Sequence, residues 1–207
     1  MISELIFRVI FSALWLLFFT TVLWVRISSG KPSEKVPTGK TSWHERRLHV
    51  VAGALFAPLW FGGIFLYALF PTSIQFLSIP VPDWFRLIMA GIAFVGTLFA
   101  LWGYRTLGKN WVHALDPSEF LKRKSETLVT GGAYRYVRNP IYLGMFTFVI
   151  ALALVAANWL LLLPSLVVVT LVYMQIGNEE KMLIAKFGEQ YRDYMNRTPR
   201  LIPKFRN

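Results

Sequence analysis

Residues 128–144 read LVTGGAYRYVRNPIYLG, and residues 178–203 read NEEKMLIAKFGEQYRDYMNRTPRLIP. Both segments carry charges and are punctuated by glycine or proline. About 35 mostly apolar residues separate them, enough to cross a bilayer of about 30 Å and return. The two segments are therefore expected to meet on one face of a membrane. Ionisable groups at a membrane boundary are candidates for a functional site.

The composition indicates an integral membrane protein. Of the 207 residues, 55% are hydrophobic and 16% are charged, whereas a soluble domain carries about 25% charged residues. Cysteine is absent, which excludes disulfides, thiolate metal sites and cysteine nucleophiles. The three histidines lie far apart without HExxH spacing, so no metal site is expected.

The apolar runs predict an all-α fold, an integral membrane bundle of about five transmembrane helices with a C-terminal interfacial helix. In lipid only helices or closed barrels satisfy the backbone, and these runs lack the alternation of barrel strands. Each run is near the roughly 20 residues that a spanning helix needs. The runs are 5–25, 48–70 (where Pro58 predicts a kink), 84–104, 141–157 and 159–177.

Charge sets the expected orientation. All but two of the 22 basic residues lie in the 26–47 loop, the 105–140 loop or the C-terminal tail. Basic loops stay cytoplasmic, which predicts an external N-terminus and a cytoplasmic C-terminus, in the inner membrane of a prokaryotic cell. The net charge of +11 raises nucleic-acid binding as an alternative function. This alternative is disfavoured because the basic residues are confined to the segments outside the apolar runs. The chain divides into helices 1–104 and a functional region 105–207.

Several features of the two polar segments have both a structural and a functional interpretation. Asn139-Pro140 is an ordinary helix start, but free amides there also bind anions. Glu179 and Glu180 at a helix end would oppose the macrodipole, so either the helix continues past them or they hold a ligand; the structural alternative is that both pair with nearby cations. The tyrosines of 134–142 are either interfacial anchors or face a cation. The spacing of apolar residues over 183–194 predicts a helix lying on the membrane surface.

Taken together, these residues resemble the isoprenylcysteine carboxyl methyltransferase and phospholipid methyltransferase superfamily. The matching residues are Asn110-Trp111, then Leu128-Val129-Thr130, Gly132, Tyr134, Tyr136, Arg138, Pro140, Tyr142 and Gly144, then Glu179-Glu180, Leu183, Phe187-Gly188, Tyr191 and Tyr194. The resemblance covers about half of the chain, and residues 1–100 match only as generic membrane spans.

The resemblance implies an S-adenosylmethionine site at the cytoplasmic ends of the last two spans. Carried over by position, its residues are Glu126, Thr127, Leu128, Val129, Tyr134, Asn139, Pro140, Ile141, Tyr142 and Glu179. Glu179 would accept hydrogen bonds from the ribose, and the helix start with Arg138 would hold the methionine carboxylate. We expect Arg138 and Glu180 to be catalytic, with Glu180 as a base, and Gln175 and Arg135 to contact the substrate.

Three positions depart from the family pattern. Family members usually carry histidine where Glu126 and Asn139 stand, and those that methylate a carboxylate carry arginine where Gln175 stands. A glutamine cannot neutralise a substrate carboxylate. The methyl acceptor is therefore left open among prenylated cysteines, lipid amines, other isoprenoids and small hydrophobic thiols or acids.

The predicted function is methyl transfer from S-adenosylmethionine to a hydrophobic, lipid-like or prenylated acceptor in the bilayer, without metal or nucleic acid. Positioning would supply most of the catalysis, because the cofactor carries its own leaving group. Two alternatives stay open, an NADPH-dependent membrane reductase of the sterol type and a non-catalytic membrane scaffold.

Overall fold

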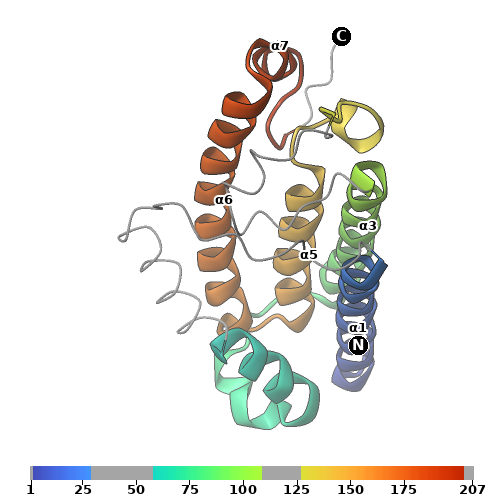
Figure 1. The fold of residues 1–207 in the computed structure, drawn as a ribbon. Coiled ribbons are helices and arrows are strands. Elements are labelled where there is room, and N and C mark those ends of the chain that lie inside the picture. The colour runs from blue at the N-terminus through green and yellow to red at the C-terminus, as the bar shows by residue number, and fades with distance from the viewer. Residues whose placement is uncertain (1, 29–57, 109–126, 203–207) are drawn as a thin grey trace.

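The computed structural model describes residues 2–28, 58–108 and 127–202, and they are helical throughout apart from loops and one bridge between Ser78 and Asn158. Figure 1 shows α3, α5 and α6 running side by side along one long axis, with α7 lying across one end. The elements are α1 (Glu4–Ser28), a helix over Pro58–Leu69, η1 (Pro71–Leu77), α3 (Asp83–Leu107), η3 (Gly132–Arg135), α5 (Pro140–Ala156), α6 (Trp159–Phe187) and α7 (Glu189–Arg197). The predicted all-α membrane fold is confirmed.

The predicted count of five membrane spans is not confirmed. Among the described residues, α1, α3 and α6 are each long and apolar enough to cross a bilayer, and α5 is a shorter apolar helix. The helix over Pro58–Leu69, which is the described part of the second predicted span, meets Pro71–Leu77 at a bend of 117°. Pro71, which cannot continue the backbone ladder, starts the second piece. The predicted kink at Pro58 lies at the edge of the described residues.

Helices α1 and α3 run in the same direction, and α5 runs against them. At one end, Glu4 pairs with Arg86 at 2.7 Å, and the Arg86 Nε donates to the Val155 carbonyl near the end of α5 at 2.8 Å. Near the other end, the backbone of Gly103 lies against Ile141 at the start of α5. The ends of α1 and α3 therefore share one face of the bundle with the start of α5, as Figure 1 shows.

Small residues let α3 and α5 approach closely. A Cβ added to Gly144 would lie 2.5 Å from the Gly96 carbonyl oxygen and 2.8 Å from the Ala100 Cβ. In lipid, helices gain little from hydrophobic burial, so close van der Waals packing between small residues carries their association. This contact fixes α5, and with it the residues at its start.

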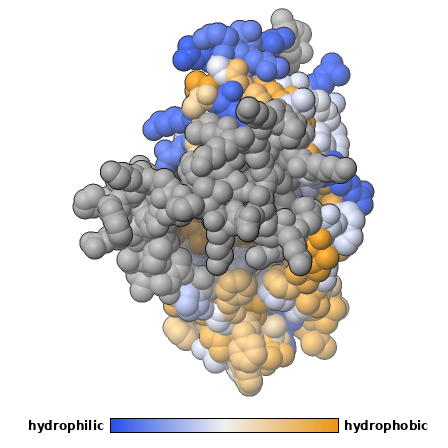
Figure 2. Space-filling view, viewed as in Figure 1, coloured by the Kyte–Doolittle hydropathy of each residue, from blue (hydrophilic) through white to orange (hydrophobic). Residues whose placement is uncertain are grey.

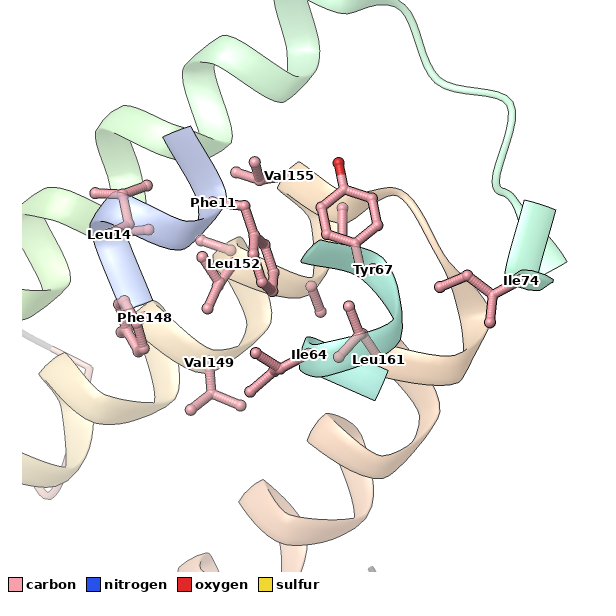
Figure 3. Packing of buried hydrophobic residues seen from close by; sticks show 14 residues of the cluster. Phe11, Leu14, Ile64, Tyr67, Ile74, Phe148, Val149, Leu152, Val155 and Leu161 are labelled. Carbon is pink, nitrogen blue, oxygen red and sulfur yellow. The ribbon is translucent and has the colours of Figure 1, made fainter. Parts of the chain in front are cut away.

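The buried core lies at the end of the bundle opposite α7. Figure 3 shows Phe148, Leu152 and Val155 of α5 packed with Phe11 of α1 and Tyr67 of the Pro58–Leu69 helix. The outer faces expose large apolar side chains, as expected for lipid contact. Hydrophilic residues (blue in Figure 2) gather near α7 instead, and hydrophobic residues (orange) cover the opposite end.

The turn between α5 and α6 agrees with the predicted tight antiparallel hairpin. Ala157 adopts the left-handed conformation at φ 49°, and the Asn158 side chain accepts a hydrogen bond from the Leu160 amide at 2.9 Å. Asn158 also donates to the Ile74 carbonyl at 2.9 Å. The hairpin therefore returns the chain to the face where α5 begins.

The last apolar run was predicted to end at Gly177, and the helix continues past it, which is one of the interpretations that the sequence left open for Glu179 and Glu180. Helix α6 continues through Glu179 and Glu180 to Phe187, and Gly188 at φ 56° separates it from α7. The apolar stripe expected over 183–194 is divided between two helices. Tyr191 and Tyr194 are buried against the protein, so α7 does not present these rings to the membrane surface.

Candidate functional site

Two glycine- and proline-dependent turns position the start of α5. Gly132 has φ 55°, and a Cβ there would lie 2.6 Å from the Thr106 hydroxyl of α3. Glycine thus allows η3 to pack on the end of α3. Asn139 occupies the N-cap position and Pro140 the first turn of α5, as the sequence predicts.

Glu180 lies at the centre of a buried ion-pair cluster with Arg138 and Arg200, here called the Glu180 clamp. The Arg138 Nε and Nη2 donate to Glu180 Oε1 at 3.0 and 2.8 Å. The Arg200 Nη2 donates to the other oxygen, Oε2. The Glu180 side chain is 4% exposed and that of Arg138 8%, so solvent screens their attraction little.

The clamp ties the segment after α7 to the start of α5. The Arg138 Nη1 donates to the carbonyls of Met195 at 3.0 Å and Thr198 at 2.6 Å. The Arg138 amide donates to the Pro199 carbonyl at 2.8 Å, and both the amide and side chain of Asn139 donate to the Arg200 carbonyl at 3.2 Å. Residues 195–200 therefore form a strap across the helix start.

This strap changes the roles expected for the helix start. The Asn139 amide is already engaged, and Pro140 has no N–H, so the amides of Ile141 and Tyr142 are the donors left in the first turn. The Arg138 guanidinium is held by Glu180 and by two carbonyls. This geometry favours a positioning role for Arg138 over direct contact with a carboxylate ligand.

The two adjacent glutamates have different surroundings. The Tyr142 hydroxyl donates to Glu179 Oε1 at 2.5 Å, and no basic side chain among the described residues pairs with Glu179. The interpretation in which the glutamates pair with cations thus holds for Glu180 and not for Glu179. Glu180 has both oxygens engaged by guanidinium groups, which favours positioning over the predicted base. Glu179 keeps an oxygen that can accept further hydrogen bonds.

Tyrosines surround Glu179 on the same side of the bundle. Burial raises the pKa of Tyr134, and the neighbouring Tyr194, Tyr104 and Glu179 add to that shift. Tyr142 also interacts electrostatically with Tyr104 and Tyr134. Three phenol rings from α3, η3 and α5 thus cluster with one carboxylate from α6. Rings and a carboxylate are the groups that attract a cation.

Helix α7 is held to η3 by its tyrosines. The Tyr194 hydroxyl donates to the Tyr134 carbonyl at 2.6 Å, and the rings of Tyr191 and Tyr194 contact each other edge to face. Burial raises the pKa of Tyr191 to about 12. The hydrogen bond to Glu180 raises the pKa of Arg200 above its usual value.

The remaining predicted residues are less closely organised. Thr127 is exposed, and Leu128 and Val129 are half-buried in the loop before η3. Gln175 is half-buried one helical turn before Glu179, so the two share a face of α6. Arg135 is exposed on η3. Glu126 lies outside the described residues.

Two residues of the site were missed by sequence reasoning. Arg200 was counted only as a basic tail residue, and its contact with Glu180 depends on the chain folding back after α7, which no local pattern indicates. Tyr104 was counted as the end of a span. Its place near Tyr134 and Tyr142 depends on the packing of α3 against the start of α5, which the chain order alone does not give.

A family model described as phospholipid methyltransferase matches residues 85–190. The chain belongs to the phospholipid methyltransferase family. The matched region runs from the start of α3 through Glu179, Glu180 and the beginning of α7, so it contains the clamp residues Arg138 and Glu180. The resemblance inferred from the sequence is confirmed at this level.

Individual relatives agree with the family. The chain is 36% identical over 83 residues to protein-S-isoprenylcysteine O-methyltransferase of Schizosaccharomyces pombe, covering 40% of this chain and 35% of that protein. The Dictyostelium discoideum enzyme of the same name is 32% identical over 90 residues, covering 43% and 37%. Methanethiol S-methyltransferase 1 of Bradyrhizobium diazoefficiens is 39% identical over 70 residues, covering 34% and 24%. The chain thus matches about a third or less of the length of these relatives.

The fold is similar to that of a solved membrane enzyme. The eukaryotic intramembrane Ras methyltransferase ICMT (isoprenylcysteine carboxyl methyltransferase) superposes with a TM-score of 0.53 at 23% identity, covering 80% of this chain and 54% of that one. This likeness supports an integral membrane helical fold for the chain.

Proposed function

We propose that the chain transfers a methyl group from S-adenosylmethionine to a hydrophobic acceptor at the membrane boundary. The observation that carries the proposal is the Glu179 cluster, in which a carboxylate and three tyrosines meet beside the start of α5. It lies in the region matched by the phospholipid methyltransferase model. When bound, S-adenosylmethionine supplies an activated methyl group on a sulfonium.

The side chains fit this cofactor. The free oxygen of Glu179 is suited to accept hydrogen bonds from ribose hydroxyls. The backbone of 127–129 offers amides and carbonyls for an adenine edge, and the Ile141 and Tyr142 amides are suited to a carboxylate. Tyr134 and Tyr142 offer ring faces to a sulfonium charge. Glu126, Asn139 and Pro140 stay part of the proposed site by position.

The protein's main task is positioning. The Glu180 clamp and the strap hold the start of α5 in place, and α5 is fixed in turn by Gly144 against α3. Such fixed geometry aligns an acceptor with a bound methyl donor. An acceptor that is apolar would approach from the bilayer, while the basic loops and the site would face the cytoplasm.

Gln175 bears on which methyl acceptor the site suits. Half-buried on the same face of α6 as Glu179, this amide offers hydrogen bonds but no charge to balance a carboxylate. The relatives named above comprise enzymes named for isoprenylcysteine and one named for methanethiol. We therefore propose two leading methyl acceptors, a hydrophobic thiol and the carboxylate of a prenylated cysteine.

The experiment offers both acceptors to detergent-purified protein with methyl-labelled S-adenosylmethionine. S-farnesylcysteine and an alkyl thiol are compared, and phosphatidylethanolamine is a third arm. We expect transfer to the thiol to exceed transfer to the carboxylate, and Gln175→Arg to reverse that preference. Binding of NADPH in place of S-adenosylhomocysteine would support the reductase alternative and overturn the proposal, and binding of neither would support a scaffold.

A further inference from the structure

A groove of about 310 Å³ lies between α1 and α3, near the ends where both helices leave their apolar segments. Its lining is formed by Thr20, Thr21, Trp24, Leu101 and Arg105. This volume is at the lower end of the range for small-ligand sites. The groove therefore has room for a polar headgroup rather than for a large cofactor.

The groove lies on a different face of α3 from the candidate methyltransferase site. Leu101 and Arg105 are one turn apart and face α1. Thr106 faces η3, and Gly103 faces the start of α5. A ligand in the groove would thus be separated from the Glu179 cluster by the body of α3.

The groove combines one cation with hydrogen-bond acceptors. The Arg105 guanidinium lies 5.7 Å from the Trp24 ring centroid, and no carboxylate among the described residues pairs with it. The Thr20 hydroxyl donates its proton to the Leu16 carbonyl at 2.8 Å, and the Thr21 hydroxyl donates to Leu17 at 2.8 Å. Their oxygens are left as acceptors.

Apolar side chains continue from the groove toward the middle of the bundle. Leu17 lies on the same face of α1 as Thr20, Thr21 and Trp24, because these residues are three, four and seven positions away. Its side chain is 39% exposed. On α3, Phe94 and Leu98 extend the face of Leu101 and are 44% and 47% exposed. A ligand whose polar group occupied the groove would therefore have an apolar surface beside it for an acyl chain.

We propose that this groove binds an anionic phospholipid with a hydroxylated headgroup, of the phosphatidylglycerol type. The phosphate would pair with Arg105, as guanidinium groups bind phosphate through charged hydrogen bonds. The headgroup hydroxyls would donate to Thr20 and Thr21, and Trp24 would lie at the interfacial level where tryptophan is enriched. A choline or ethanolamine headgroup would bring its own cation toward Arg105.

The test is native mass spectrometry of the purified full chain in detergent with equal amounts of phosphatidylglycerol and phosphatidylcholine. We expect one phosphatidylglycerol retained in preference, and Arg105→Gln to lower its retention about ten-fold, the loss of one charge-assisted bond. Arg105→Lys keeps the charge and should retain an intermediate amount. The matched control is Arg192→Gln, an exposed arginine on α7.

Three results would overturn the proposal. They are equal retention of both lipids by the unchanged protein, an equal loss from Arg105→Gln and Arg192→Gln, and displacement of the lipid by millimolar glycerol phosphate. Because Arg105 is exposed, its substitution should leave the melting temperature without added lipid unchanged. A Thr20→Val, Thr21→Val double variant, which keeps the side-chain shape, should lower the preference for phosphatidylglycerol without altering Arg105.

Discussion

Substitution of Glu180 by glutamine tests the clamp that holds the start of α5. The change keeps the volume of the side chain but removes the charge that balances Arg138 and Arg200. Breaking a buried pair by removing one partner costs about 3–5 kcal/mol, because the other charge stays buried. Arg138, with its side chain 8% exposed, is that charge here, and glutamine still accepts one hydrogen bond, so we expect about 3 kcal/mol.

For a chain of this size, about 1 kcal/mol shifts the melting temperature by about 2–4 °C. Glu180→Gln should therefore lower it by roughly 6–12 °C in a thermal unfolding assay in detergent. Arg200→Gln should cost much less, because the Arg200 side chain is 36% exposed and Glu180 keeps Arg138. Hydrogen exchange of the Arg138 and Asn139 amides, which donate to the strap, should accelerate in both variants.

The matched control is Glu189→Gln, since Glu189 also pairs with an arginine at 2.8 Å but is 78% exposed. Exposed pairs contribute about 0–1 kcal/mol, so this variant should melt close to the unchanged protein. If Glu180→Gln and Glu189→Gln melt together, the clamp does not hold the helix start and the positioning argument fails.

Three further predictions concern packing, the tyrosine cluster and pH. Gly144→Ala should lower the melting temperature because its Cβ would meet Ala100, whereas Gly91→Ala, which meets nothing within 4 Å, should leave it unchanged or slightly higher; equal effects would contradict the close contact. Tyr134→Leu should weaken S-adenosylmethionine about ten-fold and S-adenosylhomocysteine little, because only the first carries a sulfonium charge, and equal losses in calorimetric titrations would refute it. In the folded chain the pKa of Tyr191 is raised from 10.0 to about 12, so the contribution of its burial to stability is intact below pH 10 and is lost as the pH rises toward 12. Tyr191→Phe should therefore reduce the fall in melting temperature at alkaline pH. An unchanged fall would contradict the burial of this phenol.

The sequence predicted the features that depend on local chemistry and on the bilayer. Apolar length gave the positions of α1, α3 and α5, and Asn139-Pro140 gave the start of α5. The α5–α6 turn at Asn158 followed from its brevity between two apolar runs. These helix positions and this turn are determined by a few neighbouring residues or by the thickness of the bilayer, so they could be predicted without knowing any long-range contact.

The rest depends on contacts between residues far apart in the chain. Gly177 was taken as the end of the last apolar run, whereas α6 continues through Glu180, whose charge Arg138 and Arg200 balance. The second span was expected to kink at Pro58, whereas the bend among the described residues lies between Pro58–Leu69 and Pro71–Leu77. The sequence did not single out the small residues of α3 that contact Gly144, because their role depends on the packing of α3 against α5.

The most direct test is calorimetric titration of the detergent-purified chain with S-adenosylhomocysteine, comparing the unchanged protein with Glu179→Gln and Glu189→Gln. Loss of the carboxylate that accepts from Tyr142 should weaken binding ten-fold or more, about 1.4 kcal/mol, while Glu189→Gln should bind as the unchanged protein does. Unaltered affinity in Glu179→Gln would contradict the assignment of this site.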